Sequence, residues 1–417
     1  MPEKTRALMV GGVKGVFFIV SDFDIVVDKL VYGGGGLGRL DGRAVLAPFV
    51  LPGERVRVRA ASEKPGLVHA SLLEVLAASP ERVTPGCPYF THCGGCHYQH
   101  APYELQLSLK RAILEDQLRR IGKIEPPAEI EVVAREPWNY RNRVQLRTDR
   151  AELGYRQAQS HRLCPIASCP IGSPAINAAI EILREMLRDP RWPRFIRSFE
   201  LFTNETQMQL NVLETERPVA RGFFDWCAER IPGWISGTLD YADAGYAWRV
   251  SSGSFFQANR FLIAGLVDRA IEGAEGRAAL DLYAGVGLFS LPLARRFRSV
   301  TAVESGTRAV EDLRFNGERA GVVVQAERAN AEAFLENLEA APDFVLLDPP
   351  RAGIGKRMVE RLAQLRVPRI AMVSCDPATL ARDLAGLLRA GYRIERMTLI
   401  DLFPQTYHLE TVVHLML

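Results

Sequence analysis

Three thiols are gathered in the segment CPYFTHCGGC, at Cys87, Cys93 and Cys96. Gly94 and Gly95 stand between the last two and let the backbone fold around a central ion or cluster. In a cytosolic chain with only seven cysteines, such a group indicates a metal or redox site rather than a disulfide framework. The alternative is three buried thiols without a ligand.

A fourth ligand must come from another part of the chain. The segment HRLCPIASCPIG offers Cys164 and Cys169. Thiolates suit zinc or an iron–sulfur cluster. A zinc ribbon usually has two short C-x2-C knuckles, and the second knuckle is missing here, which favours iron–sulfur. Spacing alone does not name the metal.

A glycine turn further along the chain predicts a ligand site. LDLYAGVG is a buried strand that runs into Gly285 and Gly287, and SVTAVES ends the next strand with Glu304. Open α/β sheets bind ligands at the carboxyl ends of strands, where a carboxylate can accept hydrogen bonds from a ribose. The D-x-x-x-G-x-G pattern resembles the S-adenosylmethionine turn of class I methyltransferases rather than the G-x-G-x-x-G of dinucleotide binding.

Three more reactive side chains stand at predicted strand ends. Two prolines force the backbone to leave the sheet after Asp348. Cys375 ends a strand before a helix, whose positive N-terminus favours the thiolate. Glu410 lies in an apolar strand, where burial raises a carboxyl pKa towards that of a general base. The alternatives are a helix-capping Asp348, an inert core Cys375 and a solvent-facing Glu410.

The elements that position these residues fall into three predicted domains, since 417 residues exceed the ~250–300 that one core supports. Residues 1–80 predict five short strands in a small barrel of the oligonucleotide-binding type, with a hairpin at Asp41-Gly42. Residues 81–245 predict a mixed α+β domain with helices over 101–122 and 174–188. Residues 246–417 alternate strands and helices as in a doubly wound sheet, so the fold class is multidomain α/β.

The composition is that of a globular protein, with 47% hydrophobic and 24% charged residues. It excludes a disordered chain, a collagen-like fibre and a coiled-coil rod. The net charge of +3 is too small to demand a nucleic-acid partner by itself. No apolar run approaches the ~20 residues that span a bilayer. Lys14 interrupts the apolar N-terminal stretch, so we expect a leader into the first strand and a cytoplasmic protein.

A basic segment of the central domain predicts contact with RNA. Its cations are interleaved with Trp138, Tyr140 and Tyr155, which suits phosphate contact and base stacking. The alternative is a solvated strand face whose cations pair with Glu136, Asp149 and Glu152. The cations are Arg135, Arg141, Arg143, Arg147, Arg150, Arg156 and Arg162. Arg55, Arg57 and Arg59 of the barrel would add a second RNA surface.

Taken together, these motifs resemble the 5-methyluridine RNA methyltransferases, in particular the branch with a TRAM domain and an iron–sulfur cluster that modifies 23S ribosomal RNA. The resemblance extends from about Asp24 to His414. It rests on GGLGRLDGRAVLAPFVLPGERV, which looks like the TRAM signature, and on CPYFTHCGGCHYQH, SGSFFQAN, LDLYAGVG, LDPPRAG, VSCDPATLARDL and FPQTYHLETVVHL in family order.

The resemblance implies two sets of ligands. Cys164 and Cys169 both precede Pro-Ile, but Cys169 keeps the family's distance from Ser160-His161. The family's [4Fe–4S] ligands therefore match Cys87, Cys93, Cys96 and Cys169. The S-adenosylmethionine-binding positions match Gln257, Tyr283, Gly285, Gly287, Glu304, Asn330 and Asp348.

The resemblance also implies a mechanism, in which Cys375 is the nucleophile and Glu410 the base. The thiolate adds to C6 of uracil, C5 attacks the sulfonium methyl, and the base then removes the C5 proton. Asp348 would help hold the flipped base. Two residues depart from the family pattern. Asp376 replaces an asparagine and should oppose thiolate formation unless the helix N-terminus holds it, and Leu288 replaces a polar residue, which removes one donor contact.

We therefore expect a monomeric 23S ribosomal RNA methyltransferase without a membrane partner. Two other functions are alternatives. A transfer-RNA uracil-5-methyltransferase shares the catalytic motifs, although the simpler enzymes of that kind lack the barrel and cluster. A non-catalytic iron–sulfur RNA-binding protein would make Asp376 a sign of decay. The cluster motif is separate from the catalytic motifs in the sequence, which favours a structural or RNA-positioning role for the cluster.

Overall fold

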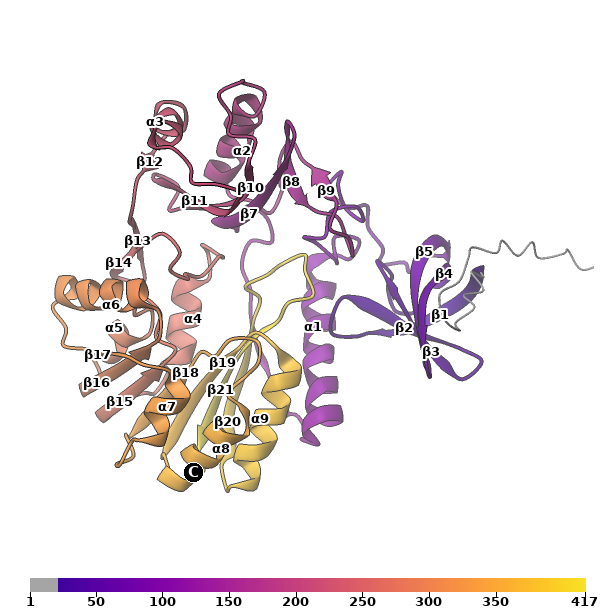
Figure 1. Ribbon diagram of the computed structural model, residues 1–417. Helices are drawn as coiled ribbons and strands as arrows, with labels where there is room; N and C mark the ends of the chain where they lie inside the picture. Colours follow the sequence, from indigo (N-terminus) through magenta and orange to yellow (C-terminus); the bar gives the residue numbers. More distant parts are fainter. Residues whose placement is uncertain (1–21) are drawn as a thin grey trace, which may run out of the picture. The chain divides into compact units, whose positions relative to one another are not determined.

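The computed structural model describes residues 22–417 (Figure 1). The leader expected at the N-terminus lies outside these residues. By its contacts the described chain divides into two compact units. The first holds residues 22–91, 96–109 and 405–407, and the second holds residues 92–95, 110–404 and 408–417. The three domains predicted from sequence, with boundaries near residues 80 and 245, are not tested by this division.

The first unit contains a closed five-stranded barrel of order β1-β2-β3-β5-β4, which confirms the predicted small barrel. Asp41 and Gly42 form the hairpin turn expected of them, both with positive φ (49° and 78°), between the paired residues Leu40 and Arg43. The strands are β1 (Asp22–Leu30), β2 (Gly35–Leu40), β3 (Arg43–Pro48), β4 (Arg55–Lys64) and β5 (Leu67–Ala77).

Alternation along β4 places its valines in the barrel core and its arginines outside, as the sequence predicts. Two of these arginines are already engaged. Arg59 binds Asp22 at 2.7 Å, and Arg57 binds Asp24 at 2.9 Å. An RNA phosphate at this face would therefore compete with carboxylates of β1.

The second unit contains a six-stranded sheet of order β12-β11-β10-β7-β8-β9 and a two-stranded sheet β13-β14. Helices α2 (Pro174–Met186) and α3 (Arg221–Arg230) belong to the same part of the chain. The strands are β7 (Arg143–Asp149), β8 (Glu152–Arg156), β9 (Leu163–Pro165), β10 (Ile196–Thr203), β11 (Met208–Thr215), β12 (Trp234–Ile235), β13 (Leu239–Asp243) and β14 (Tyr246–Val250).

The second unit also holds an eight-stranded sheet of order β17-β16-β15-β18-β19-β21-β20-β6, drawn mostly in orange to yellow in Figure 1. Strands β15 to β19 run parallel, whereas β21 is antiparallel to both of its neighbours. The strands are β6 (Glu131–Val133), β15 (Gly276–Leu282), β16 (Phe297–Glu304), β17 (Gln325–Arg328), β18 (Phe344–Leu347), β19 (Arg369–Ser374), β20 (Arg393–Ile400) and β21 (Glu410–Met416).

Helices alternate with these strands, as the doubly wound pattern predicts. The strand order reverses between β15 and β18, a topological switch point at which open α/β sheets bind ligands. The helices are α4 (Ile263–Ala270), α5 (Ser290–Leu293), α6 (Thr307–Ala320), α7 (Ala331–Glu336), α8 (Gly355–Leu365) and α9 (Pro377–Arg389).

Helix α5 is short, because the N–H groups of Arg295 and Arg296 close tight turns onto Pro292 and Leu293 before β16 begins. One expected helix differs in extent. The helix expected over 101–122 is α1 (Tyr103–Gln117), followed by a π-helical turn, Leu118–Gly122, that ends at the left-handed Lys123. Within residues 22–417, no helix is long and apolar enough to cross a membrane.

Candidate active site

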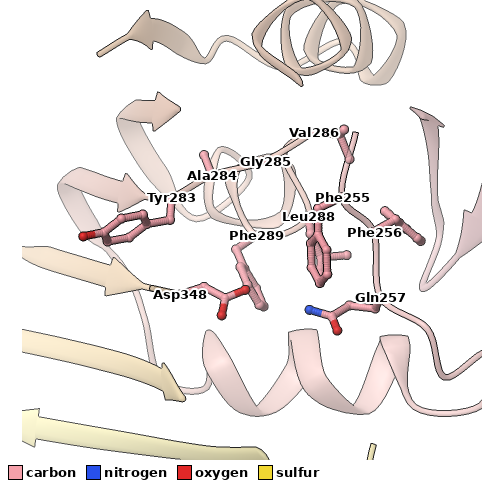
Figure 2. Close-up of a pocket in the computed structure, with 10 residues that line it drawn as sticks. All are labelled: Phe255, Phe256, Gln257, Tyr283, Ala284, Gly285, Val286, Leu288, Phe289 and Asp348. Carbon is pink, nitrogen blue, oxygen red and sulfur yellow. The ribbon is translucent and has the colours of Figure 1, made fainter. Parts of the chain in front are cut away.

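A pocket lies at the switch point between β15 and β18 (Figure 2). The segment that follows β14, the turn after β15 and the end of β18 build its walls. The lining residues are Phe255, Phe256, Gln257, Tyr283, Ala284, Gly285, Val286, Leu288, Phe289 and Asp348. The predicted donor residues Gln257, Tyr283, Gly285 and Asp348 are therefore brought together.

The turn after β15 is held by backbone hydrogen bonds from the neighbouring strand. The N–H groups of Tyr283 and Ala284 both donate to the carbonyl of Val303 at 3.0 Å. Tyr283 has a φ of 67°, which L-residues rarely adopt, and it turns the chain away from the sheet. Its hydroxyl donates to the sulfur of Met358 at 3.2 Å.

The two glycines of the turn have different surroundings. A Cβ on Gly285 would meet no atom within 4 Å, so this position faces open space. A Cβ on Gly287 would lie 2.6 Å from Leu313 and 2.7 Å from Leu291, so this position is packed. Gly285 therefore leaves room for a ligand, whereas Gly287 allows α6 to approach the turn.

Polar groups reach the pocket from both of its sides. In Figure 2 the amide of Gln257 and the carboxylate of Asp348 point towards one another, with the ring of Phe289 between them. The carboxylate of Glu304, at the end of β16, accepts from the N–H of Gly285 at 3.1 Å and of Gly306 at 2.6 Å. Glu304 thus stands next to the lining without belonging to it.

Two other predicted residues lie outside the lining. Asn330 caps α7 and accepts from the N–H of Ala333 at 3.1 Å. Gly287 packs behind the turn, as described above. Leu288, which replaces a polar residue, does line the pocket and gives that wall an apolar surface.

Cys375 and Glu410 stand at adjacent strand ends, beside the pocket. Ser374 pairs with Thr411 in the antiparallel ladder between β19 and β21. Cys375 follows Ser374 and Glu410 precedes Thr411, so both lie one residue beyond this pair. The parallel register of β18 with β19 brings Asp348 to the same edge. Cys375 and Glu410, the nucleophile and base that the resemblance implies, therefore lie at one sheet edge, and their roles remain a prediction.

Burial raises the pKa of every acid in this group. The pKa of Glu410 is held well above its usual value, first by burial and then by Asp348. Burial also raises the pKa of Asp348 to about 7. Beneath the turn, burial raises the pKa of Asp281, which accepts a hydrogen bond from Ser290, to about 7. These carboxyl groups hold protons at a pH where exposed carboxyl groups are charged.

The prediction that the helix N-terminus favours the Cys375 thiolate is wrong, because the pKa of this thiol is raised. Burial, and then Glu410, raise this pKa to about 12. The first N–H groups of α9 are taken by Asp376, whose carboxylate accepts from Ala378 at 2.9 Å and Thr379 at 3.0 Å. The helix N-terminus therefore stabilises the Asp376 carboxylate.

Sequence reasoning missed two residues of this region. Arg351 lowers the pKa of both Cys375 and Glu410 and so opposes the rise that burial and the neighbouring carboxylates cause. It follows directly after the two prolines of the Asp348 motif, which is the signal that could have found it. Phe255 is 67% exposed although it lines the pocket, and the paired phenylalanines before Gln257 were the available signal.

The basic segment of the central sheet is only partly available for RNA. Arg143 binds Glu200 at 2.7 Å, and Arg147 binds Glu214 at 2.6 Å. These carboxylates come from β10 and β11 rather than from the neighbouring acids that the sequence suggests. The exposed cations of the segment are Arg135, Arg150, Arg156 and Arg162.

The cysteines divide between the two units, and none of the seven forms a disulfide. In the second unit, the N–H of Gly95 donates to the sulfur of Cys93 at 3.4 Å. Burial, with the thiols of Cys169 and Cys93 nearby, raises the pKa of Tyr155 well above its usual value. The donor atoms suit an iron–sulfur cluster. As they lie within residues 22–417, however, no group of three or more His, Cys, Asp or Glu side chains is arranged to hold a metal ion.

Comparison with known proteins gives matches over most of the chain. A family described as tRNA (uracil-5-)-methyltransferase matches residues 232–417. The 23S rRNA (uracil(1939)-C(5))-methyltransferase RlmD of Pectobacterium atrosepticum is 35% identical over 413 residues, covering 91% of this chain and 90% of that protein. An uncharacterized RNA methyltransferase of Aquifex aeolicus is 32% identical over 93% of this chain and 97% of its own length.

A solved structure is similar along nearly the same length. It is the Pyrococcus abyssi tRNA (uracil-54, C5)-methyltransferase in complex with S-adenosyl-L-homocysteine. Its TM-score is 0.75 at 28% identity, and the match covers 94% of this chain and all of that chain (100%). A barrel-bearing chain of this length is therefore compatible with a transfer-RNA enzyme, so the barrel alone does not exclude that substrate.

Proposed function

Because the chain belongs to the S-adenosylmethionine-dependent RNA uracil-5-methyltransferase family, we propose that it methylates C5 of a uridine in 23S ribosomal RNA. The observation that carries the chemistry is the meeting of Cys375 and Glu410 at adjacent strand ends, beside Asp348 of the pocket. The ribosomal substrate is supported by relatives named RlmD at 34% and 35% identity over most of the chain.

The pocket at the switch point is the proposed donor site. Gln257 and Asp348 supply polar groups at its two sides, and Gly285 leaves room for the ligand. Glu304 is proposed to receive the ribose hydroxyls, since it ends the strand next to the turn. The proposed donor-binding set remains Gln257, Tyr283, Gly285, Gly287, Glu304, Asn330 and Asp348, with Gly287 acting through packing.

The proposed reaction begins when the Cys375 sulfur bonds to C6 of the uracil and its proton passes to a neighbouring carboxylate. Electron density then accumulates on O4 and C5 of the ring. C5 forms a bond to the methyl group, which bound S-adenosylmethionine would supply from its positively charged sulfonium, leaving S-adenosylhomocysteine. Glu410, once deprotonated, takes the proton from C5, and the bond between C6 and sulfur breaks. The carboxylic acid that took the thiol proton returns it to the Cys375 thiolate, the C5 proton passes from Glu410 to solvent, and the RNA leaves with 5-methyluridine.

Phe255 is the proposed platform for the flipped base. Its ring is exposed at the pocket, and aromatic faces stack on any base with a gain of about 1–3 kcal/mol. The cost of extruding a uridine from its stack is a few kcal/mol, so a contribution of this size matters. Phe255→Ala should weaken methylation of folded RNA more than methylation of an unstructured oligonucleotide.

We further propose that Cys87, Cys93, Cys96 and Cys169 hold a [4Fe–4S] cluster and that residues 22–77 form a TRAM domain. The thiol donor set and the N–H bond to the Cys93 sulfur support the cluster. Cys164, the other candidate for the fourth ligand, lies buried in β9 and is the matched variant for Cys169. After anaerobic purification, Cys169→Ser should lose iron and acid-labile sulfide, whereas Cys164→Ser should retain both. A colourless protein with stoichiometric zinc would contradict the cluster.

A transfer-RNA substrate is the second candidate. One solved structure that is similar to this chain along nearly its whole length is a transfer-RNA uracil methyltransferase, and the matching family carries a similar description. The donor pocket and Cys375 serve both reactions equally. The substrate must therefore be decided by experiment rather than by the catalytic residues.

The experiment is methyl transfer by anaerobically purified protein to unmodified 23S ribosomal RNA and to transfer RNA, separately, with nucleosides identified by mass spectrometry. We expect 5-methyluridine in the ribosomal RNA and none with Cys375→Ala. Cys227→Ala, which removes a thiol of α3 outside the pocket, is the control and should remain active. Product in transfer RNA alone would overturn the substrate, and activity of Cys375→Ala would overturn the mechanism.

A further inference from the structure

We propose that Asp312 and Asn316 of α6 are positioning residues of the donor pocket, fixing both of its walls although neither residue lines it. The proposal rests on the assignment of that pocket to S-adenosylmethionine. One wall consists of residues 255–257 and the other of residues 283–286, 288 and 289, together with Asp348. The two walls are 25 or more residues apart in sequence and need a common support.

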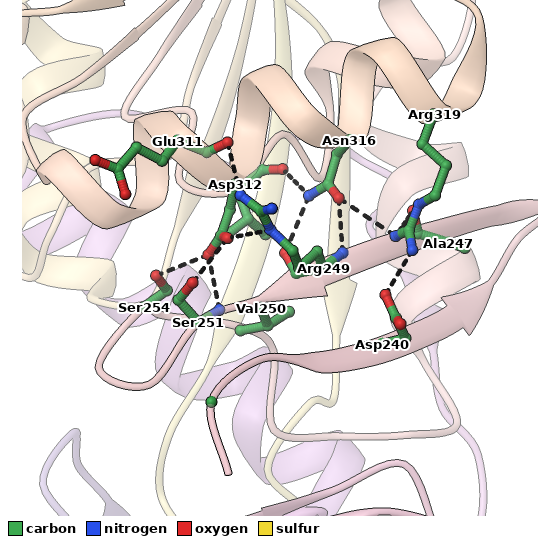
Figure 3. A network of polar contacts seen from close by, with 12 residues as sticks. Asp240, Ala247, Arg249, Val250, Ser251, Ser254, Glu311, Asp312, Asn316 and Arg319 are labelled. Atoms are coloured by element: carbon green, nitrogen blue, oxygen red, sulfur yellow. Dashed lines mark hydrogen bonds and ion pairs between the residues drawn. The ribbon is translucent and has the colours of Figure 1, made fainter. Parts of the chain in front are cut away.

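Asp312 supports the first wall (Figure 3). It has 0% exposure, and its carboxylate accepts from the N–H of Ser251 at 2.7 Å and its hydroxyl at 2.8 Å. It also accepts from the hydroxyl of Ser254 at 3.2 Å and from Nε of Arg249 at 2.8 Å. Ser254 directly precedes Phe255, so this carboxylate fixes the chain where it enters the pocket.

Asn316 lies one helical turn further along α6 and supports the second wall. It too has 0% exposure, and its amide donates to the carbonyl of Val286 at 3.0 Å, within the turn that lines the pocket. The same amide donates to the carbonyl of Arg249 at 3.1 Å and accepts from its N–H at 2.7 Å. Asn316 therefore joins β14 to the glycine turn.

One face of α6 thus sets the separation of the two walls. The neighbouring Trp248 repeats the connection, since its indole N–H donates to the carbonyl of Gly287 at 3.3 Å. A buried carboxylate with four donors has little freedom to move, because each donor it releases would be left without a partner. The positions of Phe255 and Gln257 relative to Gly285 follow from these bonds.

Asp312→Asn tests this role with little change in volume. The amide nitrogen of asparagine would face an N–H donor or a guanidinium in place of a carboxylate oxygen, and the charge that pairs with Arg249 is lost. We expect the Kd for S-adenosylhomocysteine to rise by about 10- to 100-fold, because small displacements of binding groups in a preorganised site weaken binding strongly. The Kd for RNA should stay within about threefold, because many other contacts determine it.

Glu311→Gln is the matched control. It makes the same charge change at the adjacent residue, and in Figure 3 its carboxylate points away from the network. Ser254→Ala is a milder second variant that removes a single hydrogen bond and should raise the same Kd by about two- to fivefold. Calorimetric titration with S-adenosylhomocysteine and a thermal melt are measured for each variant.

The results separate positioning from general stability. A higher Kd in Asp312→Asn and Ser254→Ala but not in Glu311→Gln supports the proposal. A lower melting temperature with an unchanged Kd in Asp312→Asn overturns it, and if that variant does not fold, an unchanged Kd in Ser254→Ala overturns it. Gln257→Ala tests the pocket itself. If Gln257→Ala binds the donor like the wild type, the pocket assignment has failed and not the positioning role.

Discussion

At the scale of single residues, Asp348, Glu410 and Cys375 carry protons that the proposed reaction must move. The thiol of Cys375, with a pKa raised to about 12 by burial and then by Glu410, does not ionise alone at neutral pH. Arg351 is the cation that opposes this effect at both Cys375 and Glu410. Its guanidinium lies 3.4 Å from Nδ1 of His408, a residue of the segment that precedes β21.

The first prediction concerns pH. The pKa of Asp348 is raised to about 7, and that of Glu410 is raised well above its usual value, so both acids lose their protons at higher pH than exposed carboxyl groups do. The single-turnover rate should therefore rise between pH 6 and 9. Asp348 raises the pKa of Glu410, and Asp348→Asn should therefore shift the rising limb to lower pH, whatever its effect on the maximum. A rate that is flat across this range would contradict the protonated ground state.

The second prediction concerns Arg351. Replacing it by methionine removes the charge that lowers the pKa of Cys375, so formation of the adduct with 5-fluorouridine RNA should slow by about 10-fold at pH 7.5. Part of the rate should return at pH 9 or in Arg351→Lys. The adduct is measured by gel shift under denaturing conditions. An equal loss at both pH values would point to a packing role instead.

The meeting of Asp348, Cys375 and Glu410 at one sheet edge was predictable from sequence, whereas their protonation was not. Asp348, Cys375 and Glu410 each stand where an apolar run ends or begins, and strand ends of one sheet meet at one edge. The pKa of Cys375 depends on carboxylates that come from other strands, and the dipole of α9 is occupied by Asp376. Neither fact follows from the neighbours of Cys375 in sequence.

At the scale of elements, the turn between β15 and α5 separates the binding of a ligand from the packing of the fold. Gly285 faces open space with a φ of 55°, and Gly287 adopts 92° against Leu291 and Leu313. One glycine therefore serves the pocket and the other serves α6.

The third prediction follows from this pair. Gly287→Ala should lower the free energy of unfolding by about 1–3 kcal/mol, because its Cβ would overlap buried leucines at a strained φ. Gly285→Ala should unfold at a temperature closer to that of the wild type but bind S-adenosylhomocysteine at least about 10-fold more weakly, since its methyl enters the ligand space. Melts and calorimetric titrations measure both effects. The proposed division of roles is contradicted if Gly285→Ala loses stability while Gly287→Ala loses binding of S-adenosylhomocysteine.

Long-range pairing accounts for the differences between predicted and observed elements. Arg143 and Arg147 belong to a segment whose nearest acids in sequence are Glu136, Asp149 and Glu152, yet their partners come from β10 and β11. Strand β6 joins the edge of the C-terminal sheet through β20, although it precedes that strand by most of the chain. Local patterns predict that a strand exists but not which strand it pairs with.

At the scale of the whole molecule, a buried ion pair connects distant parts of the second unit. Nζ of Lys110 lies 2.5 Å from the carboxylate of Asp401, and both side chains have 0% exposure. The same ammonium donates to the carbonyl of Phe403 at 2.9 Å. Lys110 and Asp401 lie 291 positions apart in sequence, so this ion pair attaches α1 to the segment that connects β20 and β21.

The fourth prediction measures this connection. Lys110→Met leaves the Asp401 carboxylate buried without its charge partner and should cost about 3–5 kcal/mol of stability in urea unfolding. Lys110→Met with Asp401→Leu should recover most of the loss, because both charges are then removed. Lys356→Met, at an exposed pair with Glu360, is the control and should change stability by less than about 0.5 kcal/mol. An effect no larger than that of the control would show that the buried pair contributes little.

The fold class was predictable at this scale, and the choice of RNA was not. The barrel, the mixed central region and the doubly wound sheet each leave a periodic pattern in the sequence. Choosing between ribosomal and transfer RNA requires the contact surface, and the cations that remain exposed, such as Arg156 and Arg162, carry no base-specific information.

The place of β21 in its sheet has a consequence for the newly made chain. This strand is inserted between β19 and β20, although it is synthesised after both. While the ribosome is still translating residues 401–409, Cys375 has already been made, but the sheet still lacks an inner strand and Glu410, the proposed base. By the proposed mechanism, a nascent chain at that stage cannot complete a catalytic cycle, and β21 must first insert between β19 and β20.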